Sequence, residues 1–253
     1  MTADTWVDTG GGTGTACQPR WCANHSGESA LRKPGRIAFG SLEAAREVLA
    51  SWLGRWIGAT VPTVELLPVP PDGPCCISRA ITGPAIPFGQ ALRAPMSPAT
   101  TKAEATAALP KFGACIVLDA LIGCCDRFNE GNIVFASAQK QWYSLDYAFS
   151  FNMHQPQGVG DPARAFGDVA LRQVYFPEIL AAVRADPSAI RQATAVASGI
   201  TNQEIDGLVA LLPHTHSPTN EAGTMANFLK ARRSRIRDIM SGWANLAQLD
   251  GII

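Results

Sequence analysis

The sequence is poor in charge and has no excess of either sign. Only 17% of the residues are charged, and 21 basic and 21 acidic residues give a formal net charge of +0. Attraction to nucleic acid or to an anionic membrane comes from clustered positive charge, so this balance predicts neither partner. The hydrophobic share of 47% instead favours a globular protein with a core.

Several other signals are missing. The first residues lack the basic and then apolar segments of a secretory signal peptide. The longest apolar run, 112–123, contains Asp119 and is shorter than the roughly 20 residues that span a bilayer. The 7 cysteines are odd in number and include adjacent pairs at 75–76 and 124–125, which suit reduced thiols better than a disulfide framework. We therefore expect a cytoplasmic protein with no membrane partner.

The order of predicted elements indicates two lobes of an α+β fold. Short strand-like stretches surround one amphipathic helix at 41–58, in which apolar residues recur at helical spacing. A strand at 75–80 leads into a Gly- and Pro-containing segment that is typical of a hinge. A helix, a hairpin and a helical tail follow. We expect a small β-rich lobe over residues 1–86 and a mainly helical lobe, which carries the hairpin, over residues 87–253.

Two apolar regions flank a short polar segment in the middle of the chain. The first, 112–123, is long enough for a buried helix that ends near Gly123. After the polar segment, the stretches 133–135 and 142–145 are apolar and aromatic, which predicts a hairpin with its turn at 138–140. The polar segment is therefore a loop between a buried helix and a hairpin.

Three side chains that carry oxygen lie at the ends of these elements. Asp126 and Asn132 fall on the loop, and Asp146 follows the second strand of the hairpin. If the turn centres on Gln139, Asn132 and Asp146 lie opposite one another across the two strands. Mg²⁺ takes oxygen ligands and usually keeps water and substrate phosphates as the others. The spacing therefore predicts a site for a hard divalent cation at the open end of the hairpin, beside Asp126.

Candidate nucleotide-binding residues lie in the N-terminal part. The glycine-rich segment at 9–18 contains Gly12 and Gly14, whose backbone N–H groups can approach phosphates without a Cβ in the way. A flexible turn is the alternative interpretation of this segment. Ser78 and Arg79, in the strand before the hinge, complete this candidate set.

A lysine and two glutamates form a second candidate set. Lys33 ends a short predicted strand and either binds a phosphate or lies on the surface. Glu43 and Glu47 are one turn apart on the helix at 41–58, and either can pair with Lys33 or face solvent. The sequence alone leaves the choice between the two glutamates open.

Five features follow one another along the chain: the strand lysine, the helix glutamate, the hinge, the pattern D-R-x-x-x-x-N and the strand-terminal aspartate. This ordered set resembles the protein-kinase-like fold. The resemblance is closer to the HipA-like kinases and their relatives among the phosphatidylinositol kinases. It covers most of the chain, and its specificity lies in the order of the pieces. The segments that carry it are ALRKP (30–34), REVLASWLGRWIGATVP (46–62), LDALIGCCDRFNEGNIVF (118–135), WYSLDYAFSF (142–151) and NFLKARRSRI (227–236).

The resemblance implies ATP and Mg²⁺ as cofactors and a role for each matched residue. Asp126 resembles the catalytic-loop aspartate that orients and deprotonates the acceptor hydroxyl. Asn132 and Asp146 resemble the two metal ligands. Lys33 resembles the lysine that binds the α- and β-phosphates, and Glu47 resembles its helix partner. Phosphoryl transfer depends on such positioning and charge neutralisation more than on a covalent nucleophile.

The sequence departs from the family pattern near the catalytic loop. The interval between Asp126 and Asn132 is one residue longer than is typical of the related phosphatidylinositol kinases, and Asn129 is an alternative ligand. Phe128 stands where a histidine is common. Arg127 is either a structural ion-pair partner or a phosphate contact, and the sequence does not separate these roles.

The predicted function is that of an ATP- and Mg²⁺-dependent phosphotransferase, a HipA-like serine/threonine kinase that transfers the γ-phosphate in line to a hydroxyl. The acceptor is a protein, and autophosphorylation, for example at Ser150, is included because HipA-like kinases act on proteins and on themselves. Two alternatives stay open. One is a catalytically weak pseudokinase that binds nucleotide or a partner, and the other is a kinase for a small molecule or lipid headgroup.

Overall fold

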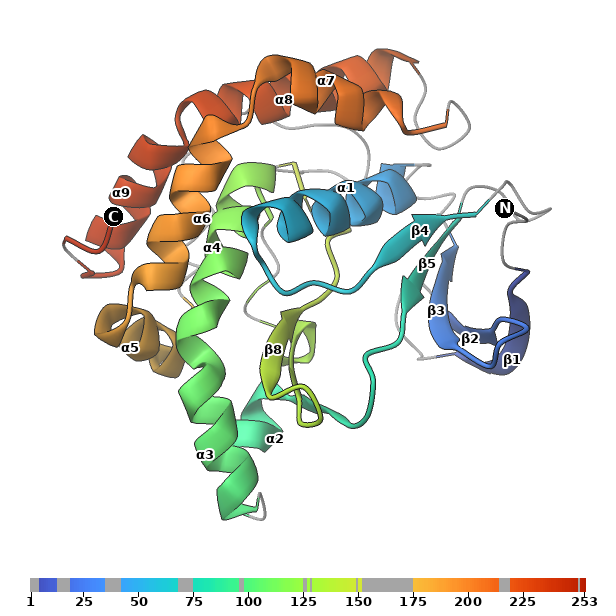
Figure 1. Cartoon of the computed structure of the whole chain (residues 1–253), viewed down its shortest axis with the longest axis horizontal. Helices are drawn as coiled ribbons and strands as arrows, with labels where there is room; N and C mark the ends of the chain where they lie inside the picture. Colours follow the sequence, from blue (N-terminus) through green and yellow to red (C-terminus); the bar gives the residue numbers. More distant parts are fainter. Residues whose placement is uncertain are drawn as a thin grey trace.

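The computed structural model describes most of the chain and shows a small antiparallel sheet beside a larger helical part (Figure 1). This arrangement agrees with the predicted α+β class and with its order of a β-rich region before a helical one. The described residues are 5–12, 19–34, 42–67, 75–95, 98–124, 127, 129–148, 150–151, 175–213, 219–249 and 251–253.

The first sheet has five strands in the order β1-β2-β3-β5-β4, and each neighbouring pair is antiparallel. Its second strand, β2, was not predicted from the sequence. Glycines with positive φ at Gly10 and Gly11 interrupt the register between β1 and β2. The strands are β1 (Val7–Gly12), β2 (Arg20–Ala23), β3 (Ser29–Pro34), β4 (Val64–Leu66) and β5 (Cys75–Arg79).

The two faces of this sheet have different surroundings. Lys33 of β3 pairs with Cys76 of β5, and directly paired residues share a face. Cys76 belongs to the main hydrophobic core, whereas Ile77, on the opposite face, belongs to a small separate cluster with Cys22 and Ala30. Because side chains alternate along a strand, Lys33 points toward the core of the molecule.

Helix α1 (Leu42–Ile57) packs against β4, β5 and the central helix of the other lobe. Its apolar residues are buried as their helical spacing predicts, including Leu49 and Leu53. Gly54 permits a close approach, since an added Cβ would lie 2.8 Å from a Val61 methyl carbon and 2.9 Å from a Leu118 methyl carbon. The helix therefore joins the sheet to the helical lobe.

Residues 80–84 connect β5 of the first sheet to a strand of a second sheet. This strand, β6 (Ala85–Pro87), pairs with β7 (Ile133–Ala136), and β7 pairs with β8 (Gln141–Ser144). The predicted hairpin is present, and part of the expected loose hinge is a strand followed by helix α2 (Phe88–Leu92). The lobe boundary between residues 86 and 87 stays a prediction.

A kinked pair of helices forms the centre of the helical lobe. Helix α3 (Ala99–Ala108) passes through a 3-10 turn (Leu109–Phe112), which contains the predicted break at Pro110, into α4 (Gly113–Ile122). All residues of α4 are buried, and it ends at Gly123 in the left-handed conformation with φ 62°. The span Ala99–Ile122 is long and apolar enough to cross a membrane, but 78% of its most apolar window is buried inside the protein.

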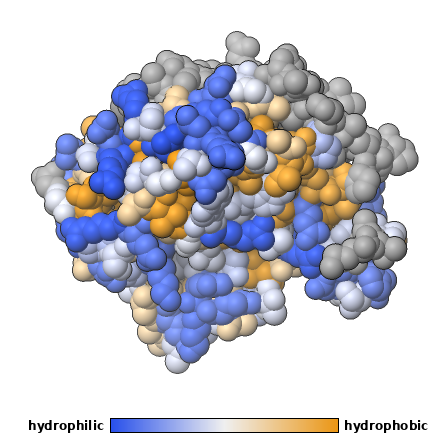
Figure 2. All heavy atoms as spheres, turned by 45° about the horizontal axis from the view of Figure 1, so that its top comes forward, coloured by the Kyte–Doolittle hydropathy of each residue, from blue (hydrophilic) through white to orange (hydrophobic). Residues whose placement is uncertain are grey.

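Among the later helices, α6, α8 and α9 pack against α4, while α5 packs on the 3-10 turn before α4 and α7 packs on α8 (Figure 1). The sequence predicts one long helix at 221–246, whereas the structure has two, because Arg235 leaves the helical region with φ −116°. Figure 2 shows exposed hydrophobic residues in separate patches between hydrophilic ones on the displayed face. The helices are α5 (Pro177–Ala185), α6 (Ser188–Gly199), α7 (Asn202–Ala210), α8 (Thr219–Ser234) and α9 (Ile236–Leu246).

Candidate functional site

The first part of the candidate site is an ion pair between Lys33 of β3 and Glu47 of α1. The Lys33 side chain is 14% exposed and that of Glu47 only 3%. The structure thereby separates Glu47 from Glu43, which the sequence had left as equal candidates for the pairing. Burial opposes the charge on Lys33, but Glu47 and Asp146 raise its pKa above the usual range. The site therefore holds a charged ammonium group at neutral pH.

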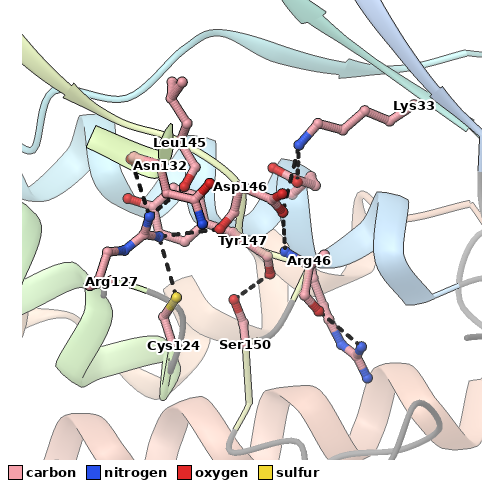
Figure 3. Close-up of polar contacts among 11 residues, drawn as sticks. Lys33, Arg46, Cys124, Arg127, Asn132, Leu145, Asp146, Tyr147 and Ser150 are labelled. Atoms are coloured by element: carbon pink, nitrogen blue, oxygen red, sulfur yellow. Dashed lines mark hydrogen bonds and ion pairs between the residues drawn. The ribbon is translucent and has the colours of Figure 1, made fainter. Parts of the chain in front are cut away.

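Asp146 approaches this ammonium from the other lobe. Its Oδ1 lies 3.8 Å from Lys33 Nζ and accepts a hydrogen bond of 3.3 Å from the N–H of Ala148. Burial disfavours the ionised carboxylate, but Lys33 and this N–H outweigh it, so the pKa of Asp146 is lowered. Figure 3 shows the Lys33 and Asp146 side chains pointing toward one another. An ionised carboxylate and an ammonium thus converge from two lobes.

The backbone of Asp146 is in a sparsely populated conformation. Its φ is 57°, in the left-handed region that residues other than glycine rarely adopt. Such a conformation costs on the order of 1–3 kcal/mol and persists only where the surroundings impose it. The contacts of the following turn therefore decide where this carboxylate points.

Asn132 lies beside Asp146 at the open end of the hairpin. Its carbonyl accepts a hydrogen bond of 2.8 Å from the N–H of Leu145, and Ile133 pairs with Ser144. The predicted register is therefore wrong by one residue, because the turn spans four residues, 137–140, instead of three. Asn132 consequently faces Leu145, with Asp146 next along the chain.

Asn129, the alternative metal ligand, forms hydrogen bonds within its own loop. Its side-chain oxygen caps the short 3-10 turn Glu130–Asn132 by accepting a hydrogen bond of 3.0 Å from the N–H of Gly131. Asn132 in turn donates its own N–H to the Asn129 carbonyl at 2.9 Å. Asn129 thus shapes the loop that presents Asn132.

These groups share one cavity of about 280 Å³. One part of its wall is polar and charged, and the other part is apolar. The cavity therefore offers a ligand one charged end and one hydrophobic end. Its lining includes Lys33, Glu47, Ser78, Asn132 and Asp146 on the polar side and Leu31, Val61 and Val64 on the apolar side.

The structure separates Arg79 from the other candidates. Arg79 pairs with Ala30, on the face of β3 opposite to Lys33, because side chains alternate along the strands. Its guanidinium forms ion pairs of 2.9 Å with Glu28 and 2.8 Å with Glu65. Arg79 therefore lies apart from the Lys33 cavity and lines a neighbouring cavity of about 500 Å³, and its predicted role in cofactor binding stays a prediction.

Four other residues named from the sequence are not among the described residues that line this cavity. Gly12 ends β1, opposite Arg20. Gly14 and Asp126 lie outside the described residues, so their roles stay predictions. Ser150 is fully buried, and its hydroxyl donates a hydrogen bond of 2.5 Å to the carbonyl of Tyr147. In this conformation Ser150 is closed to an incoming phosphate.

The sequence left the role of Arg127 undecided, and the structure makes it an ion-pair partner. Its Nε lies 3.0 Å from Oδ2 of Asp119, and both side chains are 0% exposed. The hydroxyl of Tyr175 donates a hydrogen bond of 2.5 Å to the same carboxylate. Asp119 stood alone in an apolar run, and a buried carboxylate requires a partner. That isolated charge was the available signal for the pair.

A second buried arginine, Arg46 of α1, also contacts the segment after Asp146. Its guanidinium donates a hydrogen bond of 3.2 Å to the carbonyl of Ala148 (Figure 3). Burial lowers the pKa of Arg46 to about 10, so it remains charged at neutral pH. The sequence offered no signal for this contact, which joins residues 102 positions apart.

Comparison with known proteins supports the fold. No protein-family model matches this sequence, and no curated protein does. Among solved structures, the Helicobacter pylori proinflammatory kinase CtkA is similar over 98% of both chains, with a TM-score of 0.62 and 14% identity. The FAT and kinase domain of CtTel1 is 13% identical over 88% of this chain and 21% of that one, with a TM-score of 0.39. The likeness to CtkA confirms the predicted kinase-like fold, and the HipA-like assignment within it stays a prediction.

Proposed function

We propose that this chain is an ATP- and Mg²⁺-dependent phosphotransferase. The observation that carries the proposal is the convergence of Lys33, Glu47, Asn132 and Asp146 on one cavity of a kinase-like fold. Two of these residues come from the sheet lobe, and two flank the hairpin of the helical lobe. A cleft between lobes that gathers charged groups in this way is a preferred location for a ligand site.

The donor set fits a magnesium nucleotide. Asp146 and Asn132 offer the hard oxygen ligands that Mg²⁺ prefers, and Asp146 is ionised because its pKa is lowered. Lys33 holds the α- and β-phosphates, while Glu47 fixes the direction of its ammonium. Asn132 and Asp146 would hold the Mg²⁺, whose positive charge would stabilise the transferring phosphoryl group. The apolar wall formed by Leu31 and other residues receives the base.

The acceptor in this proposal is a serine or threonine hydroxyl of a protein. Asp126 orients this hydroxyl and accepts its proton, as the resemblance to HipA-like kinases implies. The net charge of +0 gives no support to a lipid in an anionic membrane. Autophosphorylation, if it occurs in this conformation, uses a residue other than the buried Ser150.

The proposal is tested by Mg²⁺-ATP calorimetry together with transfer of labelled phosphate to the protein itself and to a generic protein acceptor. We expect Lys33→Met and Asp146→Asn to reduce transfer about 100-fold or more, because each removes a charge that stabilises the transferring group. Lys230→Met is the matched control, since Lys230 also forms an ion pair, with Asp206 at 2.5 Å, on the helices α7 and α8. Its activity is expected to equal that of the wild type.

The outcomes separate the alternatives. Transfer by wild type that Asp146→Asn retains in full would contradict the proposed site. Binding of Mg²⁺-ATP without transfer to any acceptor would favour a pseudokinase. Phosphoamino acid analysis of the labelled product then tests the serine/threonine assignment, and label found only in small molecules or lipid would redirect the acceptor class.

A further inference from the structure

The turn that carries Asp146 is held by its main-chain carbonyls from two sides. Arg127 donates to the carbonyl oxygens of Leu145 and of Asp146, the latter at 3.3 Å. Arg46 donates to the carbonyl oxygen of Ala148 at 3.2 Å. Figure 3 shows these two guanidinium groups on either side of the turn, with Lys33 beyond the carboxylate. The backbone on both sides of the Asp146 side chain is therefore anchored by charged donors.

The anchor at Arg127 is itself fixed to helix α4. Its Nε approaches both carboxylate oxygens of Asp119, at 3.1 and 3.0 Å. Tyr175 holds Oδ2 of the same carboxylate from a third direction. The ring of Tyr147 packs against the guanidinium, whose central carbon lies 4.4 Å from the ring centroid. Because Asp119 and Arg127 are fully buried, this guanidinium acts on the turn and cannot itself reach a ligand in the cavity.

The geometry uses the particular shape of an arginine. One edge of the guanidinium meets Asp119, and its terminal nitrogens meet carbonyls of the loop and the turn, including that of Asn132 at 3.5 Å. Arginine offers five N–H donors in a fixed plane, whereas lysine offers three donors on a single atom. A lysine at position 127 keeps the charge for Asp119 but cannot satisfy all the carbonyls together.

These contacts explain how Asp146 keeps its left-handed backbone. A residue with φ 57° is not stabilised by regular secondary structure, so side-chain donors must replace the missing hydrogen bonds. We infer that Arg127 is a positioning residue that sets the direction of the Asp146 carboxylate through the backbone, and that Asp119 and Tyr175 hold Arg127 in place. The expected effect on phosphate transfer rests on the proposed function, whereas the expected effect on the structure of the turn does not.

The matched control is Arg232, another fully buried arginine. Its guanidinium donates to the carbonyl of Ala120 in α4, at 2.9 Å from Nε. Arg127→Lys and Arg232→Lys therefore make the same chemical change at two buried carbonyl-binding sites. Tyr175→Phe provides a milder third variant, because it removes only the hydroxyl that holds Asp119.

The first measurement is hydrogen exchange of a peptide that covers residues 143–148. In the wild type the N–H of Leu145 is bonded to the Asn132 carbonyl, and that of Ala148 is bonded to the Asp146 carboxylate. We expect Arg127→Lys to speed exchange of these amides at least 10-fold, Tyr175→Phe to speed it less, and Arg232→Lys to leave it unchanged. Equal exchange in Arg127→Lys and Arg232→Lys would overturn the inference, whatever the activity of the protein.

The second measurement is the Mg²⁺ concentration that gives half-maximal phosphate transfer. Loss of residues that orient metal ligands from behind typically costs 10–100-fold in metal affinity or activity. We expect this concentration to rise by that factor in Arg127→Lys, with the affinity for ATP in EDTA unchanged because Lys33 is intact. An unchanged Mg²⁺ requirement would also overturn the inference. If the wild type transfers no phosphate, the proposed function fails, while the exchange result still decides the structural role of Arg127.

Discussion

Two ion pairs lie in the interior of the part of the protein that the structure describes, and they differ in what their cations can reach. Lys33 and Glu47 border the cavity, and the Lys33 ammonium has Asp146 as a second carboxylate at 3.8 Å. Asp119 and Arg127 are fully buried, and the remaining Arg127 donors go to backbone carbonyls and to the sulfur of Cys124. The Lys33 ammonium of the first pair therefore lies beside a candidate ligand site, whereas the Arg127 guanidinium of the second pair bonds groups inside the fold.

The difference indicates which buried charged group serves ligand binding and which serves the stability of the fold. A sealed pair stabilises only if every donor is satisfied, because removing one partner leaves an uncompensated charge away from water. A pair at a cavity can lose one partner and recover through protonation or water. We therefore expect substitutions at the sealed pair to act mainly on stability and substitutions at the cavity pair to act mainly on ligand binding.

The largest effect is expected for Asp119→Ala. This change leaves the Arg127 guanidinium without its carboxylate in a fully buried position, and such losses cost about 3–5 kcal/mol. Urea unfolding followed by circular dichroism measures the free energy of unfolding. A loss below about 1 kcal/mol would show that the site admits water and that the comparison is wrong.

A double variant sharpens this prediction. Asp119→Leu combined with Arg127→Met removes both charges together and replaces them with apolar groups of similar volume, which is often neutral for stability. We expect the double variant to unfold at higher urea than Asp119→Ala, although it loses the anchor of the Asp146 turn. A double variant as unstable as Asp119→Ala would assign the cost to the lost hydrogen bonds instead of the unpaired charge.

A smaller loss is expected for Lys33→Met. It leaves Glu47 buried without its ammonium, but burial already raises the pKa of Glu47, and a proton can enter from the cavity to neutralise it. We expect a cost of about 1–3 kcal/mol in the free energy of unfolding, below that of Asp119→Ala. Lys230→Met is again the control, and a Lys33→Met loss larger than that of Asp119→Ala would reverse the comparison.

The two pairs were not equally predictable from the sequence. Lys33 and Glu47 belong to an ordered set of residues whose likeness to a kinase could be recognised. Asp119 signalled a missing partner through its apolar surroundings, but spacing did not reveal that Arg127 also bonds the turn after β8, because carbonyl partners leave no mark on the sequence. The same holds for Arg46, whose contact at Ala148 depends on how α1 packs across the lobes.

The secondary-structure elements also differ in how well the sequence predicted them. The helix at 41–58 and the hairpin followed from local periodicity, and the structure confirms both. The predicted helix at 221–246 is divided at Arg235, because its apolar pattern continues across the break while the backbone turns to pack both halves on α4. The sequence does not show on which face of β5 Arg79 lies, because the side of a strand that is covered depends on its neighbours in the fold.

The lowered pKa of Asp146 at the cavity can be tested through the pH dependence of stability. Its pKa is lowered in the folded protein, so folding favours its ionised form, and this contribution is present above the unfolded value of about 3.9. The contribution is lost as the pH falls through the lower folded value. We expect the difference in unfolding free energy between wild type and Asp146→Asn to shrink between pH 6 and pH 3 in urea titrations. A difference that grows toward acid would contradict the lowered pKa.

The smallest effect is expected for Arg79→Gln, at a third kind of ion pair. Arg79 bonds Glu28 and Glu65 on the solvent side of the sheet, where all three side chains are at least a third exposed. Exposed pairs contribute about 0.2–1 kcal/mol each and are screened by salt. We expect the loss of stability to lie below that of Lys33→Met and to diminish further in 1 M salt.

The same variant tests on which face of the sheet the ligand lies. Arg79 was predicted to bind the cofactor, but strand alternation directs it away from the Lys33 cavity. Calorimetry should therefore give the same ATP affinity for Arg79→Gln as for the wild type, whereas Lys33→Met weakens binding. If Arg79→Gln also weakened binding severalfold, the ligand would extend into the neighbouring cavity that Arg79 lines. Arg79 would then belong with Lys33 as a residue that contacts the ligand.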